Sequence, residues 1–282
     1  MSALADAIVA GGLSPALPMR ELEAVEIAGY RDQWSAVPPV VAERYGVADA
    51  TLPGGIHCLT VADQPGRRVV NHALGIDPVR PLAPRTLDAI ERFFAVRGLP
   101  ALAAVAEGAP AERQLHARGW RRDVAWMKFA RAVDAPLPLR GDCPFEIQRV
   151  PLHDRLRLGE LLARAFELPA GLAPWLGAIA CRPGWECLGA YAGERLVATG
   201  SLYVAGGAGW VTWGATDPAA RGQGAQAALL AARIEMARRR RLRLLVAETG
   251  ERGSGQRDVS YRNLLGAGFH EVCVRPFWCR DR

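Results

Sequence analysis

Residues Arg221 to Gln226 have the composition and spacing of a loop that binds phosphate. They read RGQGAQ, and glycines at alternate positions let the backbone turn tightly with its N–H groups pointing one way. The helix predicted to follow begins with four unpaired N–H groups and a partial positive charge. Such a helix start binds a pyrophosphate, and the guanidinium of Arg221 adds a fixed cation. This segment therefore predicts a phosphate site.

The segments on both sides of the loop fit that prediction. An apolar run from Trp210 to Trp213 is typical of a buried strand, Pro218 ends it, and residues 223 to 240 predict a helix rich in alanine and leucine. A Walker loop is excluded because no lysine follows the glycines, and the three-glycine spacing of a Rossmann fingerprint is absent. An ordinary strand, turn and helix, with glycines that serve only the turn, is the alternative.

Three motifs in this order resemble the acetyl-CoA binding core of the GNAT N-acetyltransferase superfamily. They are ATDPAARGQGAQAALLAA, the strand LRLLVAE at residues 242 to 248, and SYRNLLGAGF, which ends at Phe269. The family loop has Gln or Arg, two variable residues, Gly, one variable residue, and then Gly or Ala. Residues 221 to 225 match this pattern, and Gln226 departs from it. The resemblance covers residues 143 to 282.

The family fold and the length of the chain together predict two domains. The resemblance implies an α/β (α+β) fold with two GNAT-like domains in tandem, each a mixed, mostly antiparallel sheet flanked by helices. The chain has 282 residues, and its first half echoes the second, because residues 69 to 78 parallel residues 210 to 218. We expect domains at 1–133 and 143–282 with a linker at 134–142, a layout similar to that of the mycothiol synthases.

Only the second half carries the glycine loop. Pro78, Pro81 and Pro84 occupy the equivalent stretch of the first half, and proline has no N–H group to offer a phosphate. We therefore expect the N-terminal domain to be a degenerate GNAT-like domain without a phosphate loop, which binds CoA poorly and serves as a scaffold or as a wall of the substrate site.

The resemblance implies that the C-terminal domain binds acetyl-CoA as its acyl donor. In the family, the thioester lies between two parallel strands that splay apart, and the strand before the loop pairs with the pantetheine. The residues implied to bind the cofactor, by position, are Gly214, Ala215, Thr216, Arg221, Gly222, Gln223, Gly224, Ala225, Gln226, Ser260 and Asn263.

The same resemblance implies that a primary amine attacks the acetyl carbonyl directly, which requires a base and an acid. Glu248 ends the splayed strand and is the leading candidate base, and the alternative is that it is an exposed carboxylate or a partner for an arginine. Glu251 and Asp217, which lie in loop or turn contexts, are the other candidate bases. The proton-donating tyrosine of the family is replaced by Leu264. Tyr261, one helical turn earlier, is the candidate acid; a packing role for Tyr261, and water as the proton source, are the alternatives.

Two other functions stay open at this point. The missing tyrosine is compatible with a non-catalytic acyl-CoA-binding or regulatory protein. A net charge of +6 suits a nucleic-acid binder, but it also suits an anionic cofactor. The four arginines at residues 238 to 241 fall at the end of the predicted helix, where cations stabilise the helix dipole. No aromatic residues alternate with them, so the sequence argues against nucleic acid as a partner.

The remaining composition predicts a bacterial cytoplasmic protein without a metal. The five histidines and six cysteines lack the spacing of metal ligands or of a CxxC motif. No secretory leader and no membrane span are expected, and a single lysine, Lys128, is typical of a GC-rich bacterial genome. The acceptor is left open between a small-molecule amine, an amino acid, an antibiotic and a protein N-terminus, and the sequence predicts no oligomeric state.

Overall fold

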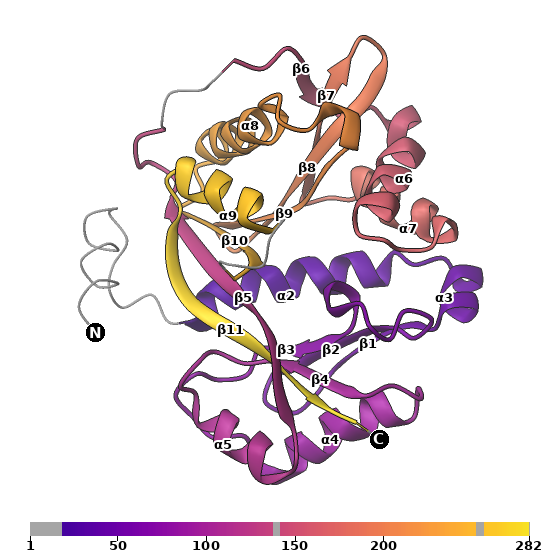
Figure 1. The fold of residues 1–282 in the computed structure, drawn as a ribbon, viewed down its shortest axis with the longest axis vertical. Coiled ribbons are helices and arrows are strands. Elements are labelled where there is room, and N and C mark those ends of the chain that lie inside the picture. The colour runs from indigo at the N-terminus through magenta and orange to yellow at the C-terminus, as the bar shows by residue number, and fades with distance from the viewer. Residues whose placement is uncertain (1–18, 138–141, 252–256, 282) are drawn as a thin grey trace. The chain divides into compact units, whose positions relative to one another are not determined.

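The computed structural model describes residues 19–137, 142–251 and 257–281, and it divides into two compact units (Figure 1). The N-terminal unit contains residues 18–128 together with residues 273–282. The C-terminal unit contains residues 129–272. Two long strands, β5 (Arg121–Ala132) and β11 (His270–Arg280), have residues in both units.

The N-terminal unit combines a short-stranded sheet with helices. Its strand order is β1-β2-β3-β4-β11. Strands β3 and β4 pair in parallel, whereas β1 with β2, β2 with β3, and β4 with β11 pair antiparallel. The elements within this unit are α2 (Met19–Ser35), α3 (Pro39–Tyr45), β1 (Val47–Thr51), β2 (His57–Val61), β3 (His72–Leu74), α4 (Pro84–Ala95), β4 (Ala101–Ala104) and α5 (Pro110–Ala117).

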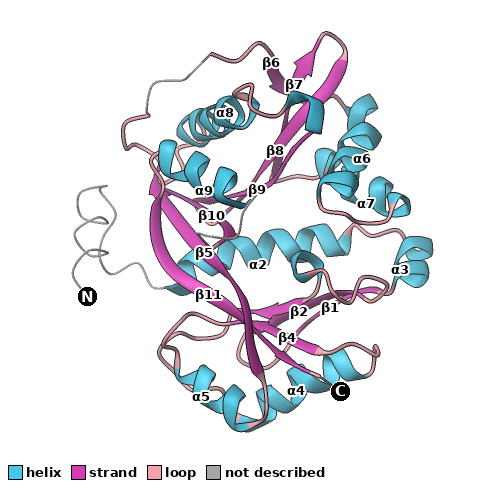
Figure 2. Ribbon diagram, in the orientation of Figure 1, coloured by secondary structure: helices cyan, strands magenta, loops and turns pink. Residues whose placement is uncertain are grey.

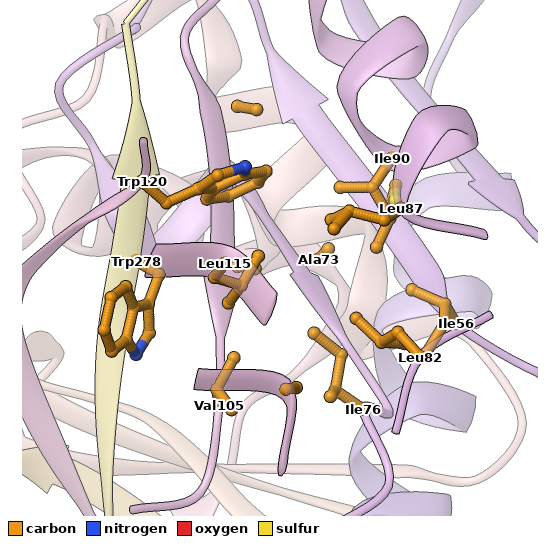
Figure 3. Close-up of a cluster of buried hydrophobic side chains, with 14 of the residues drawn as sticks. Ile56, Ala73, Ile76, Leu82, Leu87, Ile90, Val105, Leu115, Trp120 and Trp278 are labelled. Atoms are coloured by element: carbon orange, nitrogen blue, oxygen red, sulfur yellow. The ribbon is translucent and has the colours of Figure 1, made fainter. Parts of the chain in front are cut away.

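The core of the N-terminal unit forms because its helices carry apolar residues at helical spacing. On α4 the buried side chains include Leu87, Ile90 and Phe94, which lie on one face. They pack in one cluster with Trp120 and with Trp278 of β11 (Figure 3). The last strand of the chain therefore supplies a large side chain to the core of the first unit.

The C-terminal unit is a mixed sheet flanked by helices (Figure 2). Some of these helices come before its long strands in the sequence, and others come after them. Its strand order is β5-β10-β9-β8-β7-β6. The strands from β6 to β9 pair antiparallel, and β9 and β10 pair in parallel. Its remaining elements are β6 (Glu146–Arg149), α6 (Arg155–Ala165), α7 (Ala173–Ala178), β7 (Trp185–Ala192), β8 (Arg195–Ala205), β9 (Ala208–Thr216), α8 (Ala225–Arg239), β10 (Leu244–Gly250) and α9 (Arg257–Gly266).

Helix α8 packs on this sheet through an apolar contact that contains several alanines. Ala225 and Leu229 of α8 form a buried cluster with Leu188 of β7 and with Val197 and Ala198 of β8. Small side chains let the backbones approach. The packing fixes the position of the first turn of α8, which carries the loop of interest.

The fold class expected from the sequence is confirmed, since both units combine helices with a mixed, mostly antiparallel sheet. The expected helix at residues 223 to 240 is α8, and the expected strand at residues 242 to 248 is β10. The sequence predicted two domains joined by a linker at residues 134 to 142. In the structure, the boundary between the compact units falls within β5, and residues 273–282 belong to the N-terminal unit.

Candidate functional site

The candidate loop follows β9 directly. Asp217 caps a short 3-10 turn, because its side chain accepts a hydrogen bond from the N–H of Ala219 at 3.0 Å. Its own backbone N–H donates to the carbonyl of Val197 on β8 at 2.8 Å. Gly222 and Gly224 then adopt left-handed conformations with φ of 76° and 79°, which glycine reaches without strain. A side chain at Gly224 would also lie 2.6 Å from the carbonyl oxygen of Asp142. The loop therefore turns sharply into α8.

The turn leaves a row of backbone donors at the start of α8. None of the N–H groups from Gly222 to Ala227 makes a backbone hydrogen bond to the part of the chain that the structure describes, and the helical bonds begin with the Ala228 N–H to the Gly224 carbonyl at 3.0 Å. Gly222 and Gln223 are exposed. Unpaired N–H groups at a helix start, together with the helix dipole, make a site for an anion.

The side chains of the loop have different placements. Arg221 is exposed and can swing toward a phosphate. Gln223 is exposed, and its side-chain amide donates to the carbonyl of Ala219 at 3.1 Å. Ala225 is buried in the cluster under α8, so that only its backbone faces the loop.

Gln226 points its side chain at the sheet. Its Nε2 donates to the carbonyls of Ala215 at 2.9 Å and Thr199 at 3.1 Å and to the hydroxyl oxygen of Thr216 at 3.0 Å. The small residue that the family prefers at this position could make none of these bonds. The side chain therefore anchors the helix start on β8 and β9, and only the backbone N–H of Gln226 remains available to a ligand.

Strands β9 and β10 separate beside this loop. They pair in parallel from Ala208 with Leu244 to Val211 with Ala247, and no described residue beyond that point continues the pairing. Strand β9 runs on through Gly214, Ala215 and Thr216. Gly214 is exposed, Ala215 is buried and Thr216 is half-buried. A parallel pair that opens at its carboxyl end leaves backbone groups of both strands for a ligand.

The equivalent loop of the N-terminal unit is closed. The carboxylate of Asp77 accepts the N–H groups of Val79 at 2.9 Å and Arg80 at 3.1 Å. The N–H of Leu82 donates to the side chain of Gln114 at 2.8 Å. Proline supplies no N–H at positions 78, 81 and 84. Most of the donors that would meet a phosphate are thus either used or missing.

Comparison with solved structures identifies proteins of the same fold. No protein-family model matches the sequence, and no curated protein matches it. A GCN5-related N-acetyltransferase from Kribbella flavida has a TM-score of 0.62 at 17% identity, over 86% of this chain and 92% of that chain. A tandem GNAT protein from the clavulanic acid biosynthesis pathway has a TM-score of 0.52 at 16% identity, over 85% and 86% of the two chains.

A second GCN5-related N-acetyltransferase, from Sphaerobacter thermophilus, has a TM-score of 0.59 at 17% identity, over 98% of this chain and 89% of that chain. The chain has the tandem GNAT fold. At these identities the likeness concerns the path of the backbone, so the chemistry of the tandem GNAT fold in this chain has to be argued from its own residues.

Glu248 lies on β10, one residue beyond the end of its pairing with β9. The residue is half-buried, and both of its carboxylate oxygens are shielded from solvent. This position is at the mouth of the gap between the two strands. The sequence-based candidate base is therefore beside the gap that the GNAT fold opens.

Helix α9 places its candidate residues in different surroundings. Tyr261 is buried, its ring packs edge-on against Phe129 with centroids 4.9 Å apart, and its hydroxyl donates to the carboxylate of Glu271. Ser260 is exposed and Asn263 is half-buried. Tyr261 thus has a structural partner for its proton, whereas Ser260 and Asn263 have side chains that a ligand can reach.

One charged residue near the gap was not found from the sequence. Arg233 is 2% exposed and lies in the middle of α8, where arginine is usually a solvated residue of the helix surface. A signal was available, because position 233 follows Leu229 and Leu230 at the spacing of the buried face of the helix. An arginine at an apolar position of an amphipathic helix indicates a buried cation.

The described residues contain no cluster of three or more His, Cys, Asp or Glu side chains that could hold a metal ion. Within the same ranges, no helix has the length and apolar character needed to cross a membrane.

Proposed function

We propose that this chain is an acyltransferase that moves an acetyl group from acetyl-CoA to a primary amine, and that its C-terminal unit does the chemistry. The observation that carries the proposal is the row of N–H groups from Gly222 to Ala227, which make no backbone hydrogen bond within the described chain. These donors suit the pyrophosphate of CoA. The fold shared with GNAT acetyltransferases supports the same donor.

The proposed path of the donor follows the open gap. With its pyrophosphate on the loop, the pantetheine arm runs along the backbone of Gly214, Ala215 and Thr216, beyond the last pair between β9 and β10. The thioester then lies near Glu248. Ser260 and Asn263 on α9 are proposed to contact the cofactor, since α9 packs against β10 and α8.

The proposed reaction is a direct transfer. The amine nitrogen attacks the acetyl carbonyl carbon, the carbon–sulfur bond breaks, and the electron pair leaves with sulfur as a thiolate. Glu248 accepts the amine proton, directly or through water. Water protonates the thiolate, because the hydroxyl of Tyr261 already donates to Glu271. The acceptor is proposed to be a small-molecule amine or a protein N-terminus.

The N-terminal unit is proposed to bind no CoA, because Asp77 and Gln114 use its loop donors. It serves instead as a scaffold. All six cysteines are free thiols, which supports a protein that works in a reducing cytoplasm.

The test is binding of acetyl-CoA and CoA to the full chain by titration calorimetry, with Gly222→Asp and Gly222→Asn compared. A side chain at Gly222 meets no atom within 4 Å, and Asp and Asn are both among the residues that tolerate a positive φ. Gly222→Asp puts a carboxylate against the pyrophosphate and should weaken binding by about a hundredfold or more relative to Gly222→Asn, the loss expected for one uncompensated charge. Equal affinities of the two variants, or no binding by the wild type, would overturn the proposal.

A second function has one observation in its favour. Leu264 stands where the family has its proton donor, and the hydroxyl of Tyr261 is committed to Glu271. A protein that binds acyl-CoA without turning it over would need no proton donor. Tight binding without acetyl transfer to any amine in a broad panel would favour this second function.

A further inference from the structure

Strand β9 carries a bulge at the point where it leaves β10. Thr199 of β8 lies opposite Ala215, and Ser201 lies opposite Thr212, so that Gly200 alone faces Trp213 and Gly214. Trp213 has a φ of +49°, which is uncommon for a bulky residue. Such a bulge bends a strand and increases its twist. The bulge follows Val211, the last residue that pairs with β10.

The guanidinium of Arg233 fills the space at this bulge. Its Nη1 donates to the carbonyls of Ser201 and Thr212, both at 3.4 Å, and its Nε donates to the carbonyl of Leu229 at 3.1 Å. A side chain on Gly200 would lie 2.6 Å from the Cζ atom of Arg233. The cation therefore bonds to both strands of the bulge, and glycine at position 200 makes room for it.

This buried cation has no carboxylate to neutralise it among the described residues. Burial alone lowers the pKa of Arg233, to about 9, so the guanidinium still carries its charge near neutral pH. The titratable groups on the neighbouring strands do not cancel its charge. Cys187 of β7, which bonds to Ser201, keeps its proton because burial raises its pKa to about 12. The carboxylate of Glu186 pairs with Arg149 and Arg240, and Glu248 lies across the gap on β10.

We propose that Arg233 is a positioning residue of the acyl-transfer site, which holds the bulge of β9 in place and directs a positive potential at the sulfur of CoA. This inference rests on the proposed function, since it needs the thioester to lie in the gap between β9 and β10. Nη1 bonds to the Thr212 carbonyl, one residue beyond the last β9–β10 pair, so the charge is adjacent to the mouth of the gap.

The consequence concerns the leaving group. When the carbon–sulfur bond breaks, its electron pair moves to sulfur. In our proposal, this negative charge forms close to the buried guanidinium of Arg233. A charge fixed in a site of low polarity stabilises such a developing anion without reorganisation. This explains how a chain with Leu264 in place of a proton-donating tyrosine can release CoA as a thiolate and leave its protonation to water.

The test uses free CoA and needs no acceptor. The thiolate absorbs ultraviolet light more strongly than the thiol, so a pH titration of CoA bound to the full chain gives the pKa of the bound thiol. Relative to CoA in solution, the wild type should lower this pKa by about one to three units, the range for a cation at short distance. Arg233→Gln keeps hydrogen-bond donors but loses the charge, and it should return the pKa to the value of free CoA. Arg233→Lys should retain most of the shift.

Calorimetry on the same samples separates the possible failures. No binding of CoA by the wild type would overturn the proposed function itself. Binding with an unshifted thiol pKa in the wild type, or with the same shift in Arg233→Gln as in the wild type, would overturn the role of Arg233 and leave the acyltransferase proposal standing. An unshifted thiol pKa in the wild type would overturn the role of Arg233 even if Arg233→Gln does not fold, and a lowered pKa would then be assigned by comparison with Arg233→Lys.

Discussion

The side-chain amide of Gln226 donates a 2.9 Å hydrogen bond to the carbonyl of Ala215, and this bond joins the first turn of α8 to the strand that leads into the loop. The same nitrogen reaches the carbonyl of Thr199 and the hydroxyl of Thr216. The two ends of the loop are therefore held at a fixed separation. A phosphate site depends on that separation, because its N–H groups must converge.

Gln226→Glu should disrupt this anchor more than Gln226→Ala. A carboxylate cannot donate to the two carbonyls and would repel them, whereas alanine only leaves them without a donor, at a cost of about 1–3 kcal/mol in the free energy of unfolding. We expect CoA affinity to fall in the order wild type, Gln226→Ala, Gln226→Glu. Urea unfolding and calorimetry measure the two effects; an unchanged affinity in Gln226→Glu would show that the anchor does not shape the loop.

Glu248→Gln should leave CoA binding intact and slow acetyl transfer by about a hundredfold or more, the usual contribution of a general base. The substitution keeps the size of the side chain at the mouth of the gap and removes only its capacity to accept the amine proton. Glu251→Gln, just beyond β10, is the matched control and should keep a rate close to that of the wild type. Equal rates in the two variants would remove Glu248 from the mechanism.

Tyr261→Phe should affect stability rather than rate. The hydroxyl donates to Glu271 while the ring packs on Phe129, so losing the hydroxyl should lower the free energy of unfolding by about 1 kcal/mol. We expect the turnover number to change by less than about tenfold, since water protonates the leaving thiolate in our proposal. A loss of a hundredfold or more at unchanged CoA affinity would instead make Tyr261 the acid.

His72 should make the N-terminal unit sensitive to acid. Its Nδ1 donates to the carbonyl of Arg68 at 2.8 Å, and burial lowers its pKa from 6.5 to about 4. Below pH 6.5 the unfolded chain therefore binds a proton that the folded chain does not, and stability falls until the pH reaches about 4. The loss attributable to His72 should be about 3 kcal/mol.

The measurement is the free energy of unfolding as a function of pH, followed by tryptophan fluorescence. His72→Gln should reduce the slope between pH 6.5 and 4, and the exposed His116→Gln should leave it unchanged. A slope that is identical in wild type and His72→Gln would assign the acid sensitivity to other groups, such as His57, whose pKa is also lowered to about 4 by burial.

Removing residues 273–282 should unfold the N-terminal unit. Arg275 pairs with Glu23 and Glu26 of α2, at 3.0 Å and 3.1 Å, and Trp278 is in the main apolar cluster of that unit (Figure 3). The deletion leaves buried carboxylates without this cation, and it empties the place of a large side chain; each effect costs about 3–5 kcal/mol.

Removal of residues 281–282 alone is the control for this truncation, because Asp281 makes only an exposed ion pair with Arg121. Far-ultraviolet circular dichroism and limited proteolysis of the N-terminal unit report the result. A truncated chain whose N-terminal unit resists the protease as well as the control does would show that β11 is dispensable. For the same reason, cutting the chain at the linker would not yield an intact N-terminal unit.

The amino-acid sequence by itself determined the local features of this protein. The glycines at 222 and 224, the strand before them and the helix after them are encoded by neighbouring residues, and the N–H groups of the loop follow from that geometry. The prolines at 78, 81 and 84 likewise predicted an N-terminal loop with few N–H donors for a phosphate. These features depend on turns and helix starts of a few residues, which local sequence controls.

Only the tertiary structure decided the contacts between distant residues. Residues 273–282 belong to the N-terminal unit, and the hydroxyl of Tyr261 donates to Glu271. The guanidinium of Arg233 lies beside Gly200 at the bulge. Each of these depends on which strands become neighbours. The free energy that selects the neighbouring strands comes from burial and hydrogen bonding summed over the whole chain. A short sequence motif therefore does not predict which strands pair.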